Sequence, residues 1–580
     1  MNPAGFYTGE YQLFGKRLKG RLVIPSGIRC IRGSTIQRVL DEVPQIGVIT
    51  TKSINLQGKA GYREPIYARY SSGSFINAVG LSNPGAEAFR DELAQVRVPA
   101  GKAILTSLFG GGSDDFARCA EILAPVSDGF ELNMSCPHAS GYGIEIGQDC
   151  ELVCAIVRAV IDAAGLPVVV KLSSTLPRIA DTAKACLEAG AIGFTLINTV
   201  GPSMVAVGND PILSNRVGGL SGNAIRPMGL RAVEAVRRVI GPEPLIIGMG
   251  GIGTAEHIEQ YRAMGADLFG VGSALTGLDS EGMRAYCAQL ERDLLASAPR
   301  CSPGEDGPDS RVDMSYHAVT VDAVRHLTEE LFELTLSRLP GVSRPGELAG
   351  RYYFLCSPGA GEKPFAVLSW ERRAILVKRV GAFTKHLQGL APGARILLRG
   401  PYGRPVHPIP GVNRYFLVGG GTGIASLPEI AAQVAAPGVS VHAVLGARRQ
   451  AELYGLDDFA RYGEVSVSTD DGSAGFHGRV SGLLDQILAA AAEEELSRAA
   501  VILCGPEPMI HACAAVARRF VAEARILGAV EYQTSCGVGI CGKCAAPDGH
   551  LTCIDGPFLP VASFEQRAEP ALKPAQPTVG

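Results

Sequence analysis

Long apolar runs are absent from the sequence, which contains no uninterrupted stretch of about 18 apolar residues or more, the minimum for a membrane-spanning helix. The first residues, MNPAGFYTGEYQLFGKR, also lack the apolar core of a signal peptide. We therefore expect a cytoplasmic protein. In that compartment most of the 15 cysteines would be reduced thiols, metal ligands or catalysts rather than disulfides.

An excess of charge of either sign is also lacking. The chain has 54 Lys and Arg against 57 Asp and Glu, a net charge of -3, and no acidic tail. No internal repeat is visible either. The charge balance excludes the strongly basic surface that binds nucleic acid, so we expect small-molecule partners, with no nucleic acid and no membrane.

Four cysteines near the C-terminus are the most informative feature that is present. They follow the spacing C-x4-C-x2-C-x8-C, typical of a plant-type 2Fe-2S cluster, and they are Cys536, Cys541, Cys544 and Cys553. Glycines that tolerate positive φ, as a backbone folded tightly around a cluster requires, lie between them: Gly537, Gly539 and Gly542. A zinc site would usually show two short C-x2-C pairs, and unpaired thiols are the other alternative. The spacing therefore predicts metal ligands in an electron carrier.

The length of 580 residues predicts three or four domains, because one core serves about 100 to 200 residues. The clearest linker is Arg300–Arg311 (RCSPGEDGPDSR), which is rich in Pro, Gly, Ser and Asp and has no apolar periodicity. It divides the chain into roughly equal halves. The last residues (EQRAEPALKPAQPTVG) have the composition of a disordered tail.

The first half alternates short β-branched runs with helical stretches of about 12 residues. The runs include Val168–Val170, Phe194–Ile197 and Leu245–Ile247. Nearly 300 residues with this rhythm suit a (β/α)8 TIM barrel, whose active site lies at the C-terminal ends of the strands. Two glycine-rich strand ends, 248–252 and 270–274, predict a phosphate cradle there. A Rossmann sheet is the alternative, but its GxGxxG fingerprint is absent from this half.

The second half changes pattern part of the way along. Residues 314–408 show the alternating runs of a small antiparallel β unit, such as Leu331–Leu336 and Ala374–Val377. From Arg414 a strand leads into the glycine run 419–423 and an Ala-rich helix, which together form an anion cradle. Such a run taken alone can also serve only packing. The whole chain is therefore an α/β multidomain protein.

Seven ordered motifs in the second half carry a family resemblance: KPFAV (363–367), VGAFT (380–384), RGPYG (399–403), GGGTG (419–423), TDDGS (469–473), CGPEPM (504–509) and the four cluster cysteines. They resemble the electron-transfer subunit of NAD-linked (class 1B) dihydroorotate dehydrogenases. The resemblance assigns FAD to Lys363, Pro364, Phe365, Gly381 and Thr384. It assigns NAD to Gly419, Gly420, Gly421, Thr422, Gly423, Asp470, Gly505 and Pro506. The family usually has Arg and Ser where this chain has Lys363 and Ala366, and lysine lacks the bidentate fork.

Residues 15–295 resemble the catalytic subunit of the same enzymes, so both halves of a two-subunit enzyme are fused here. The shared pieces are TTKS (50–53), NAVGLSNPG (77–85), ELNMSCP (131–137), VKL (170–172), INT (197–199), GGLSG (218–222) and the two glycine cradles. The resemblance assigns FMN to Ser26, Gly27, Lys52, Lys171, Ser221, Gly250, Gly251, Gly272 and Ser273. It assigns the substrate to Asn77, Asn133, Asn198 and Thr199, and we expect Lys52 and His138 to be further substrate-binding residues. Asn offers both a donor and an acceptor, as a cyclic imide demands.

Cys136 is the candidate general base. Oxidation of a dihydropyrimidine removes a C5 proton while a C6 hydride goes to the flavin, so a base must face the flavin across the substrate. Cys136 lies at a strand end that enters a glycine-bearing loop, 139–147, which suits a mobile lid. A lone cysteine by composition alone is more often a small buried hydrophobe. The NMSCP context favours the catalytic interpretation.

The chain departs from the resemblance at His138, where dihydroorotate dehydrogenases usually have Asn. The sequence CPH followed by Gly147-Gln148-Asp149 is similar to dihydropyrimidine dehydrogenases, which reduce uracil and thymine. Dihydroorotate is favoured by the NAVGLSNPG segment and by the attached reductase half. Histidine could still donate to a carboxylate, or could merely cap the lid.

The resemblance implies oxidation of dihydroorotate to orotate, with electrons passing from FMN through the 2Fe-2S cluster and FAD to NAD+. Reverse flow toward a pyrimidine or another cyclic enone, and an NADH-driven diaphorase or redox-sensing module without substrate turnover, are the alternatives. A homodimer is expected. The expected domains are a barrel (1–299), a linker (300–313), an FAD-binding β-barrel (314–408), an NAD-binding domain (409–527), a cluster domain (528–565) and a disordered tail (566–580).

Overall fold

The computed structural model describes residues 11–134, 147–296 and 312–565, which form two compact units. The first unit contains the chain up to Val312 together with Val538–Ala545. The second contains Asp313–Gly537 and, among the described residues, 546–565. In the described parts of the chain, no helix is both long enough and apolar enough to cross a membrane.

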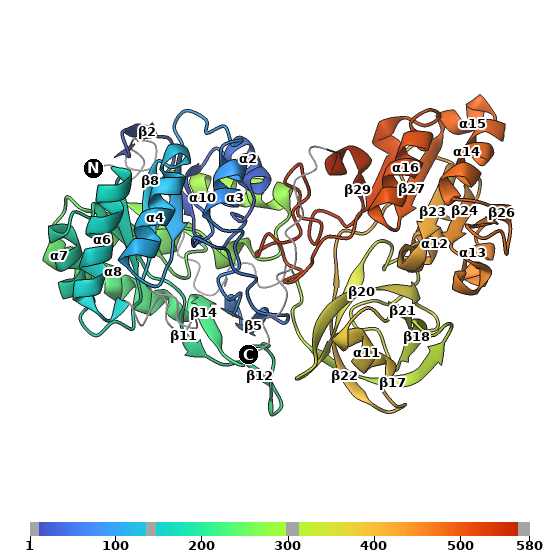
Figure 1. Ribbon diagram of the computed structural model, residues 1–580, viewed down its shortest axis with the longest axis horizontal. Helices are drawn as coiled ribbons and strands as arrows, with labels where there is room; N and C mark the ends of the chain where they lie inside the picture. Colours follow the sequence, from blue (N-terminus) through green and yellow to red (C-terminus); the bar gives the residue numbers. More distant parts are fainter. Residues whose placement is uncertain (1–10, 135–146, 297–311, 566–580) are drawn as a thin grey trace. The chain divides into compact units, whose positions relative to one another are not determined.

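The first unit is built on a closed barrel of eight parallel strands, which confirms the predicted TIM barrel. In order around the barrel the strands are β3 (Leu22–Ile24), β4 (Ile46–Thr50), β7 (Ala103–Leu108), β8 (Gly129–Asn133), β9 (Val168–Leu172), β10 (Gly193–Leu196), β15 (Leu245–Met249) and β16 (Leu268–Gly270) (Figure 1). Sequential strands lie side by side because each βα unit packs beside the one before it. The interior contains apolar strand residues such as Val23, Leu105 and Ile247, and the hairpin β1 (Tyr11–Leu13) and β2 (Lys16–Leu18) adds two leucines to this cluster.

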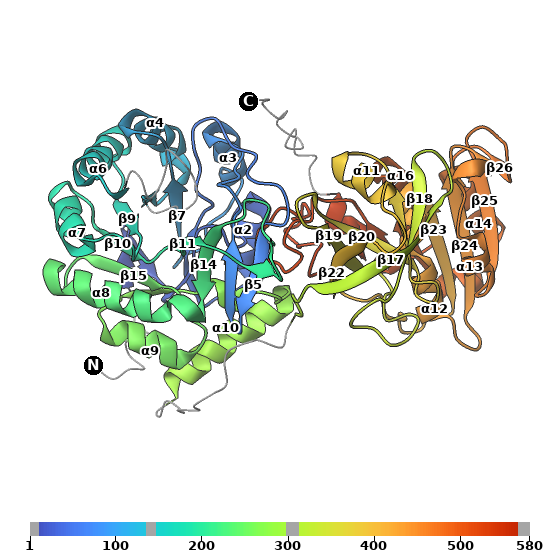
Figure 2. The same ribbon diagram turned by 90° about the horizontal axis from the view of Figure 1, so that it is seen from below.

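Helices surround the barrel strands. They are α2 (Gly33–Glu42), α3 (Ala86–Leu93), α4 (Ser113–Leu123), α6 (Cys150–Ala164), α7 (Ile179–Glu188), α8 (Arg226–Ile240), α9 (Ala255–Ala263) and α10 (Ser280–Leu295). In Figure 2, α4, α6, α7 and α8 lie outside the ring that contains β7, β9, β10 and β15. Helix α6 shows why such segments are helical: the Asp149 side chain accepts the Leu152 N–H at its start, and Gly165 in the left-handed region ends it. Its buried face follows helical spacing at Val153, Ile156, Val157 and Val160.

A small antiparallel sheet extends from the strand ends of this barrel. Its strand order is β11 (Val200–Ser203), β14 (Gly218–Gly222), β6 (Ser74–Asn77) and β5 (Tyr67–Ser71). A two-stranded ribbon, β12 (Ala206–Val207) and β13 (Asp210–Pro211), lies between β11 and β14 in sequence. The Tyr67 and Thr276 hydroxyls lie 3.0 Å apart, which joins β5 to the segment after β16.

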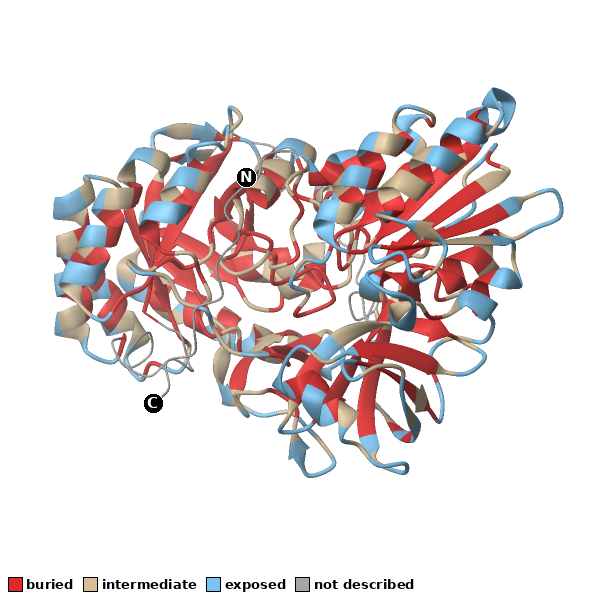
Figure 3. Ribbon diagram, turned by 45° about the vertical axis from the view of Figure 1, so that its right-hand side comes forward, coloured by how far each residue is buried: buried red, intermediate tan, exposed pale blue. Residues whose placement is uncertain are grey.

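The second unit contains a closed antiparallel barrel of six strands, as predicted for residues 314–408. Around the barrel the strands are β17 (His317–His326), β18 (Leu331–Leu336), β21 (Ala374–Lys378), β20 (Gly361–Ser369), β19 (Tyr352–Ser357) and β22 (Arg395–Tyr402). The short helix α11 (Ala382–Gln388) follows β21. In Figure 3 most strands of this barrel are largely buried, whereas its turns are exposed, and β17 has buried residues only at Val319 and Val321.

A seven-stranded sheet lies in the second unit after the barrel in sequence. Its order is β26 (Phe476–His477), β25 (Glu464–Thr469), β24 (Ser440–Ala447), β23 (Arg414–Gly420), β27 (Ala499–Cys504), β28 (Ile526–Ala529) and β29 (Leu559–Pro560). Its helices are α12 (Pro428–Val434), α13 (Leu456–Ala460), α14 (Val480–Ala490), α15 (Glu493–Ser497) and α16 (Glu507–Ala517). Successive residues of β23 alternate between two cores, with Tyr415 and Leu417 in one and Phe416 and Val418 in the other. Both faces of the sheet are therefore covered, as in doubly wound folds.

Candidate functional site

A buried polar network joins the C-terminal ends of neighbouring barrel strands. The Oγ atoms of Ser26 and Ser53 lie 3.2 Å apart, and that of Ser107 lies 2.9 Å from Ser53. Ser107 donates to Glu131 Oε1 at 3.1 Å, and Lys171 Nζ lies 3.7 Å from the same oxygen. Glu131 and Lys171 are 0% and 4% exposed. The network therefore places a cation and its counter-charge inside the barrel mouth.

Two predicted substrate residues are in contact with this network and with each other. Asn133 donates from Nδ2 to Ser53 Oγ at 3.0 Å, and Asn198 donates to Asn133 Oδ1 at 3.3 Å. The Thr199 N–H donates to Asn198 Oδ1 at 2.8 Å. The structure thus brings three predicted substrate residues, Asn133, Asn198 and Thr199, into one hydrogen-bonded chain. Such amides can present a donor and an acceptor to a planar ring.

Asn77 and Ser221 come from the sheet that extends from the barrel. They lie on the paired strands β6 and β14, where Asn77 donates to the Gly219 carbonyl at 3.3 Å and Ser221 donates to the Phe75 carbonyl at 3.3 Å. Their positions are therefore set by sheet register, because each side chain is tied to the neighbouring strand.

Lys52 lies beside the loop that follows β3. A Cβ built on Gly27 would lie 3.7 Å from Lys52 Nζ, an ordinary contact distance, and the φ of +92° is what favours glycine at this position. The Gly27 N–H donates to the Cys30 thiol at 3.0 Å. Burial raises the pKa of Cys30 to about 11, although Lys52 and Lys171 lower it in part. Cys30 is therefore a neutral thiol at pH 7, and it does not neutralise either lysine.

The two predicted glycine cradles occupy the turns after β15 and β16. Gly250 and Gly251 have φ of +120° and +74°, and a Cβ on Gly251 would lie 2.7 Å from the Gly222 carbonyl oxygen. Tyr261 donates to the Gly250 carbonyl at 2.8 Å, and a Cβ on Gly272 would lie 3.0 Å from Pro25 Cγ. Glycine permits the close approach of Gly251 to the Gly222 backbone, and such a turn would suit the predicted phosphate cradle.

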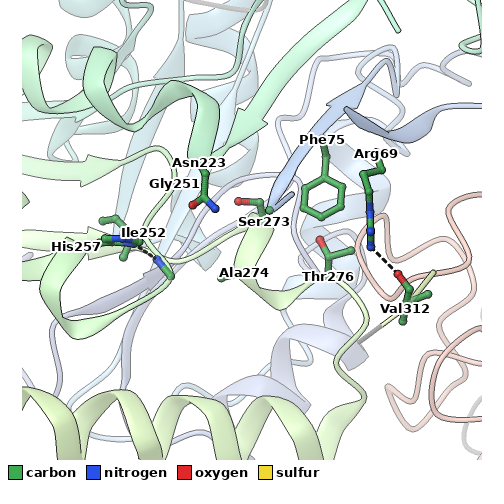
Figure 4. A pocket seen from close by; sticks show the side chains of 12 residues that line it. Arg69, Phe75, Asn223, Gly251, Ile252, His257, Ser273, Ala274, Thr276 and Val312 are labelled. Atoms are coloured by element: carbon green, nitrogen blue, oxygen red, sulfur yellow. Dashed lines mark hydrogen bonds between the residues drawn. The ribbon is translucent and has the colours of Figure 1, made fainter. Parts of the chain in front are cut away.

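A pocket opens beside these turns and contains two of the predicted cofactor residues, Gly251 and Ser273. Its other polar lining residues are Arg69, Asn223, His257 and Thr276 (Figure 4). Arg69 donates to the Val312 carbonyl at 2.7 Å. His257 accepts the Gly253 N–H through Nδ1 at 3.2 Å, which leaves Nε2 to carry the proton of a neutral ring. Backbone turns, a hydroxyl and a guanidinium around one pocket match the chemistry of a phosphate ester.

Sequence reasoning did not assign several of these residues. Glu131 begins the ELNMSCP motif, which assigns it no role, yet its Oε2 is buried with no hydrogen-bond partner among the described residues. A carboxylate inside the apolar strand run GFELN was a signal that could have identified it. No comparable signal marked Arg69 or His257, because their place in the pocket depends on how distant elements pack.

In the second unit, the GGGTG and CGPEPM turns meet at the carboxyl ends of adjacent strands. Gly419 of β23 pairs with Cys504 of β27, and a Cβ on Gly423 would lie 2.4 Å from the Cys504 carbonyl carbon. The strand order reverses between β23 and β27, and ligands of open α/β sheets bind at such a switch point. Burial raises the pKa of Cys504 to about 12, so its thiol stays protonated and unreactive. The GGGTG turn forms a 3-10 segment, Gly421–Ser426, and the α-helix expected there begins only at Pro428.

The other predicted nucleotide residues lie on the same unit. Asp470 follows β25, where its N–H donates to the Ala447 carbonyl at 3.1 Å. The predicted FAD residues Lys363, Pro364 and Phe365 lie on β20, and Thr384 Oγ1 accepts the N–H of Gly381 at 3.1 Å at the start of α11. The rings of Phe365 and Phe383 stack with centroids 6.5 Å apart, which links β20 to this helix.

Replacing Gly423 with Ala should weaken NADH binding by at least about tenfold, because the added Cβ would overlap the Cys504 backbone and force the two turns apart. NADH-dependent dye reduction, measured against NADH concentration, checks this. Gly389→Ala is the comparison in the same unit, since Gly389 has φ -88° and its added Cβ would meet nothing closer than the His386 carbonyl oxygen at 3.7 Å. Equal losses in the two variants would contradict a role for the close contact.

The four predicted cluster cysteines are all buried, with exposures of 1%, 7%, 2% and 1% for Cys536, Cys541, Cys544 and Cys553. The three glycines between them have positive φ, as predicted: +79° at Gly537, +71° at Gly539 and +75° at Gly542. Within the described ranges, however, no group of three or more His, Cys, Asp or Glu side chains has the arrangement of a metal site. The burial and backbone suit a cluster, which stays a prediction. The predicted base Cys136 and the predicted substrate residue His138 lie outside the described residues.

Comparison with known proteins assigns the first half to a family. Residues 9–294 match the family model described as dihydroorotate dehydrogenase. The catalytic subunit of dihydroorotate dehydrogenase B (NAD(+)) from Pyrococcus horikoshii is 39% identical over 267 residues, which cover 46% of this chain and 86% of that protein. The chain belongs to the dihydroorotate dehydrogenase family. The corresponding subunit from Methanothermobacter thermautotrophicus is 36% identical over 297 residues, or 50% of this chain and 95% of that protein.

The second half of this dihydroorotate dehydrogenase homologue matches a different family model. Residues 417–515 match an oxidoreductase NAD-binding domain. One chain therefore combines a dihydroorotate dehydrogenase barrel with an NAD-binding domain. A chain from the structure of an NADH-dependent reduced ferredoxin-NADP oxidoreductase also aligns, at 26% identity over 43% of this chain and 90% of that chain, with a TM-score of 0.37 that is too low to establish a shared fold.

Proposed function

We propose that this protein oxidises dihydroorotate to orotate and reduces NAD+ to NADH within one polypeptide. The observation that carries the proposal is that one chain contains both a dihydroorotate dehydrogenase barrel and an oxidoreductase NAD-binding domain. The relatives named dihydroorotate dehydrogenase B (NAD(+)), catalytic subunit, support the choice of substrate and of acceptor.

The barrel residues fit FMN. The turn at Gly250 and Gly251 has little room for a Cβ atom, and its close backbone suits the phosphate of FMN. Lys52 and Lys171 supply cations near the polar network at the strand ends. The amides of Asn133 and Asn198 would hold the substrate ring. When bound, FMN supplies a hydride acceptor, and FAD with a 2Fe-2S cluster supplies carriers between it and NAD+.

Proton removal is assigned to Cys136 on its sequence context. Loss of the C5 proton and of the C6 hydride leaves the 5,6 double bond of orotate, so the overall reaction yields orotate, NADH and one proton. Replacing the base should slow this step by about 10² to 10⁴ fold without preventing substrate binding.

The test is to add dihydroorotate anaerobically to the reconstituted oxidised protein and follow flavin bleaching, then add NAD+ and follow NADH. Wild type should bleach and form NADH, and in Cys136→Ala both should be slower by about 10² to 10⁴ fold. Cys119→Ala is the matched control, because Cys119 is a buried thiol on α4. Bleaching by dihydrouracil but not by dihydroorotate would overturn the substrate assignment and point to His138, with His138→Asn as the next variant. Dye reduction by NADH with no bleaching by either substrate would favour a diaphorase.

A further inference from the structure

A short segment of the second half belongs to the barrel unit. Residues Val538–Ala545 lie in the first compact unit, although the chain on both sides of them lies in the second. This segment contains Cys541 and Cys544, two of the four predicted cluster ligands. It is therefore part of the same unit as the predicted flavin-binding loops.

Arg29 makes two hydrogen bonds to this segment and further contacts to the barrel. Its backbone N–H donates to the Ile540 carbonyl at 3.1 Å, and its Nε donates to the Gly539 carbonyl at 2.9 Å. From the same guanidinium, Nη2 donates to the Leu278 carbonyl and Nη1 lies 3.7 Å from Met283 Sδ. Arg29 is only 3% exposed. One buried side chain thus ties the segment to two places on the barrel.

The anchor points adjoin the predicted flavin loops. Arg29 comes two residues after Gly27, in the loop that follows β3. On the other side, the Gly277 N–H, four residues after Ser273, donates to the Val538 carbonyl at 2.9 Å. A Cβ on Gly542 would lie 2.6 Å from Ile31 Cγ2, so the segment packs closely on the loop.

The backbone at Arg29 supports a specific role. Its φ of +53° lies in the left-handed region, which is uncommon for residues other than glycine and is found where the surroundings hold a strained conformation in place. A planar guanidinium can donate to carbonyls in two directions at once, whereas a lysine ammonium lacks this rigid, forked arrangement of N–H donors. The residue type and the conformation both serve the contact with Val538–Ala545.

We propose that Arg29 positions the Cys541 and Cys544 segment against the flavin-binding loops of its own chain, and that this contact sets the rate at which electrons leave the barrel. The inference rests on the proposed function for its kinetic part. Arg29 acts through the segment and is a positioning residue.

The kinetic test compares three reactions in the reconstituted full chain. They are the first phase of flavin bleaching by dihydroorotate, dye reduction by NADH, and NADH formation from dihydroorotate and NAD+. In Arg29→Lys the third should fall by about tenfold to a hundredfold, because small displacements have large kinetic effects, while the first two change by less than about twofold. Arg237→Lys is the matched control, since Arg237 also donates to several carbonyls, those of Gly241, Pro244 and Gly265.

A cofactor-independent test follows amide hydrogen exchange by mass spectrometry. The backbone N–H groups of residues 29 and 277 should exchange faster in Arg29→Lys than in the wild type, and at the wild-type rate in Arg237→Lys. An unchanged coupled rate, an equal fall in all three reactions, or unchanged exchange at these amides would overturn the proposal. If the wild type fails to bleach with dihydroorotate, the proposed function fails, and the exchange result still decides whether Arg29 holds the segment.

Discussion

Gly251→Ala should yield a protein that retains FAD but binds almost no FMN. The left-handed φ of +74° costs an Ala about 1 to 2 kcal/mol, and the added Cβ would lie 2.7 Å from the Gly222 oxygen and 3.0 Å from Arg226 Cβ. The turn must therefore open, which removes the close backbone approach that a phosphate requires. Chromatography of the released flavins measures the FMN to FAD ratio, and bleaching by dihydroorotate should disappear while NADH-dependent dye reduction persists.

The control for this prediction lies two residues away in the same loop. Gly253→Ala adds a Cβ whose nearest neighbours, Ala274 Cβ and His257 Nδ1, lie at 3.7 Å and 4.0 Å, and φ there is not in the left-handed region. This variant should keep a wild-type flavin ratio. Normal FMN content in Gly251→Ala, or an equal loss in both variants, would rule out the cradle.

Glu131→Gln should destabilise the barrel by about 3 to 5 kcal/mol, because it leaves the buried Lys171 ammonium without its counter-charge. Ser107 can still donate to the amide oxygen, so the loss would come from charge rather than from shape. The midpoint of flavin release in urea, followed by fluorescence, measures this effect. The uncompensated cation should also raise the reduction potential of any flavin that remains bound.

The double variant Glu131→Gln with Lys171→Met separates the ion pair from the rest of the network. If the charge pair is responsible, removing both charges should recover most of the lost stability, since the remaining groups are neutral. Destabilisation that simply adds across the two sites would show that the two residues act independently, at odds with the 3.7 Å contact.

The fold could be predicted largely because its signals are local. Each βα unit of the barrel can be recognised from the pattern of about 30 consecutive residues. Strands such as β18 begin and end at the same residues as the apolar run that predicts them. The GGGTG turn was likewise a strand end followed by a helical segment. The two families named by the comparisons match the resemblance drawn from these motifs.

Contacts that join distant elements could not be predicted in this way. The pairing of Glu131 with Lys171 requires the register of β8 on β9, in which Asn133 lies opposite Lys171. The contact between Arg29 and Gly539 spans 510 positions of sequence. Individual cofactor and substrate roles, the dimer and the cluster itself remain predictions, because spacing specifies which residue types are present and not how they meet.

The path of the chain has a consequence for how such an enzyme can be divided. The described chain passes from one unit to the other after Val312, after Gly537 and again after Ala545. A break in the linker before residue 312 would not separate two self-contained folds, because the downstream fragment still supplies Val538–Ala545 to the barrel unit. Expressed as separate halves, the polypeptides should complement each other in equal amounts. Fusion then contributes chiefly a fixed stoichiometry and a high effective concentration of each half for the other.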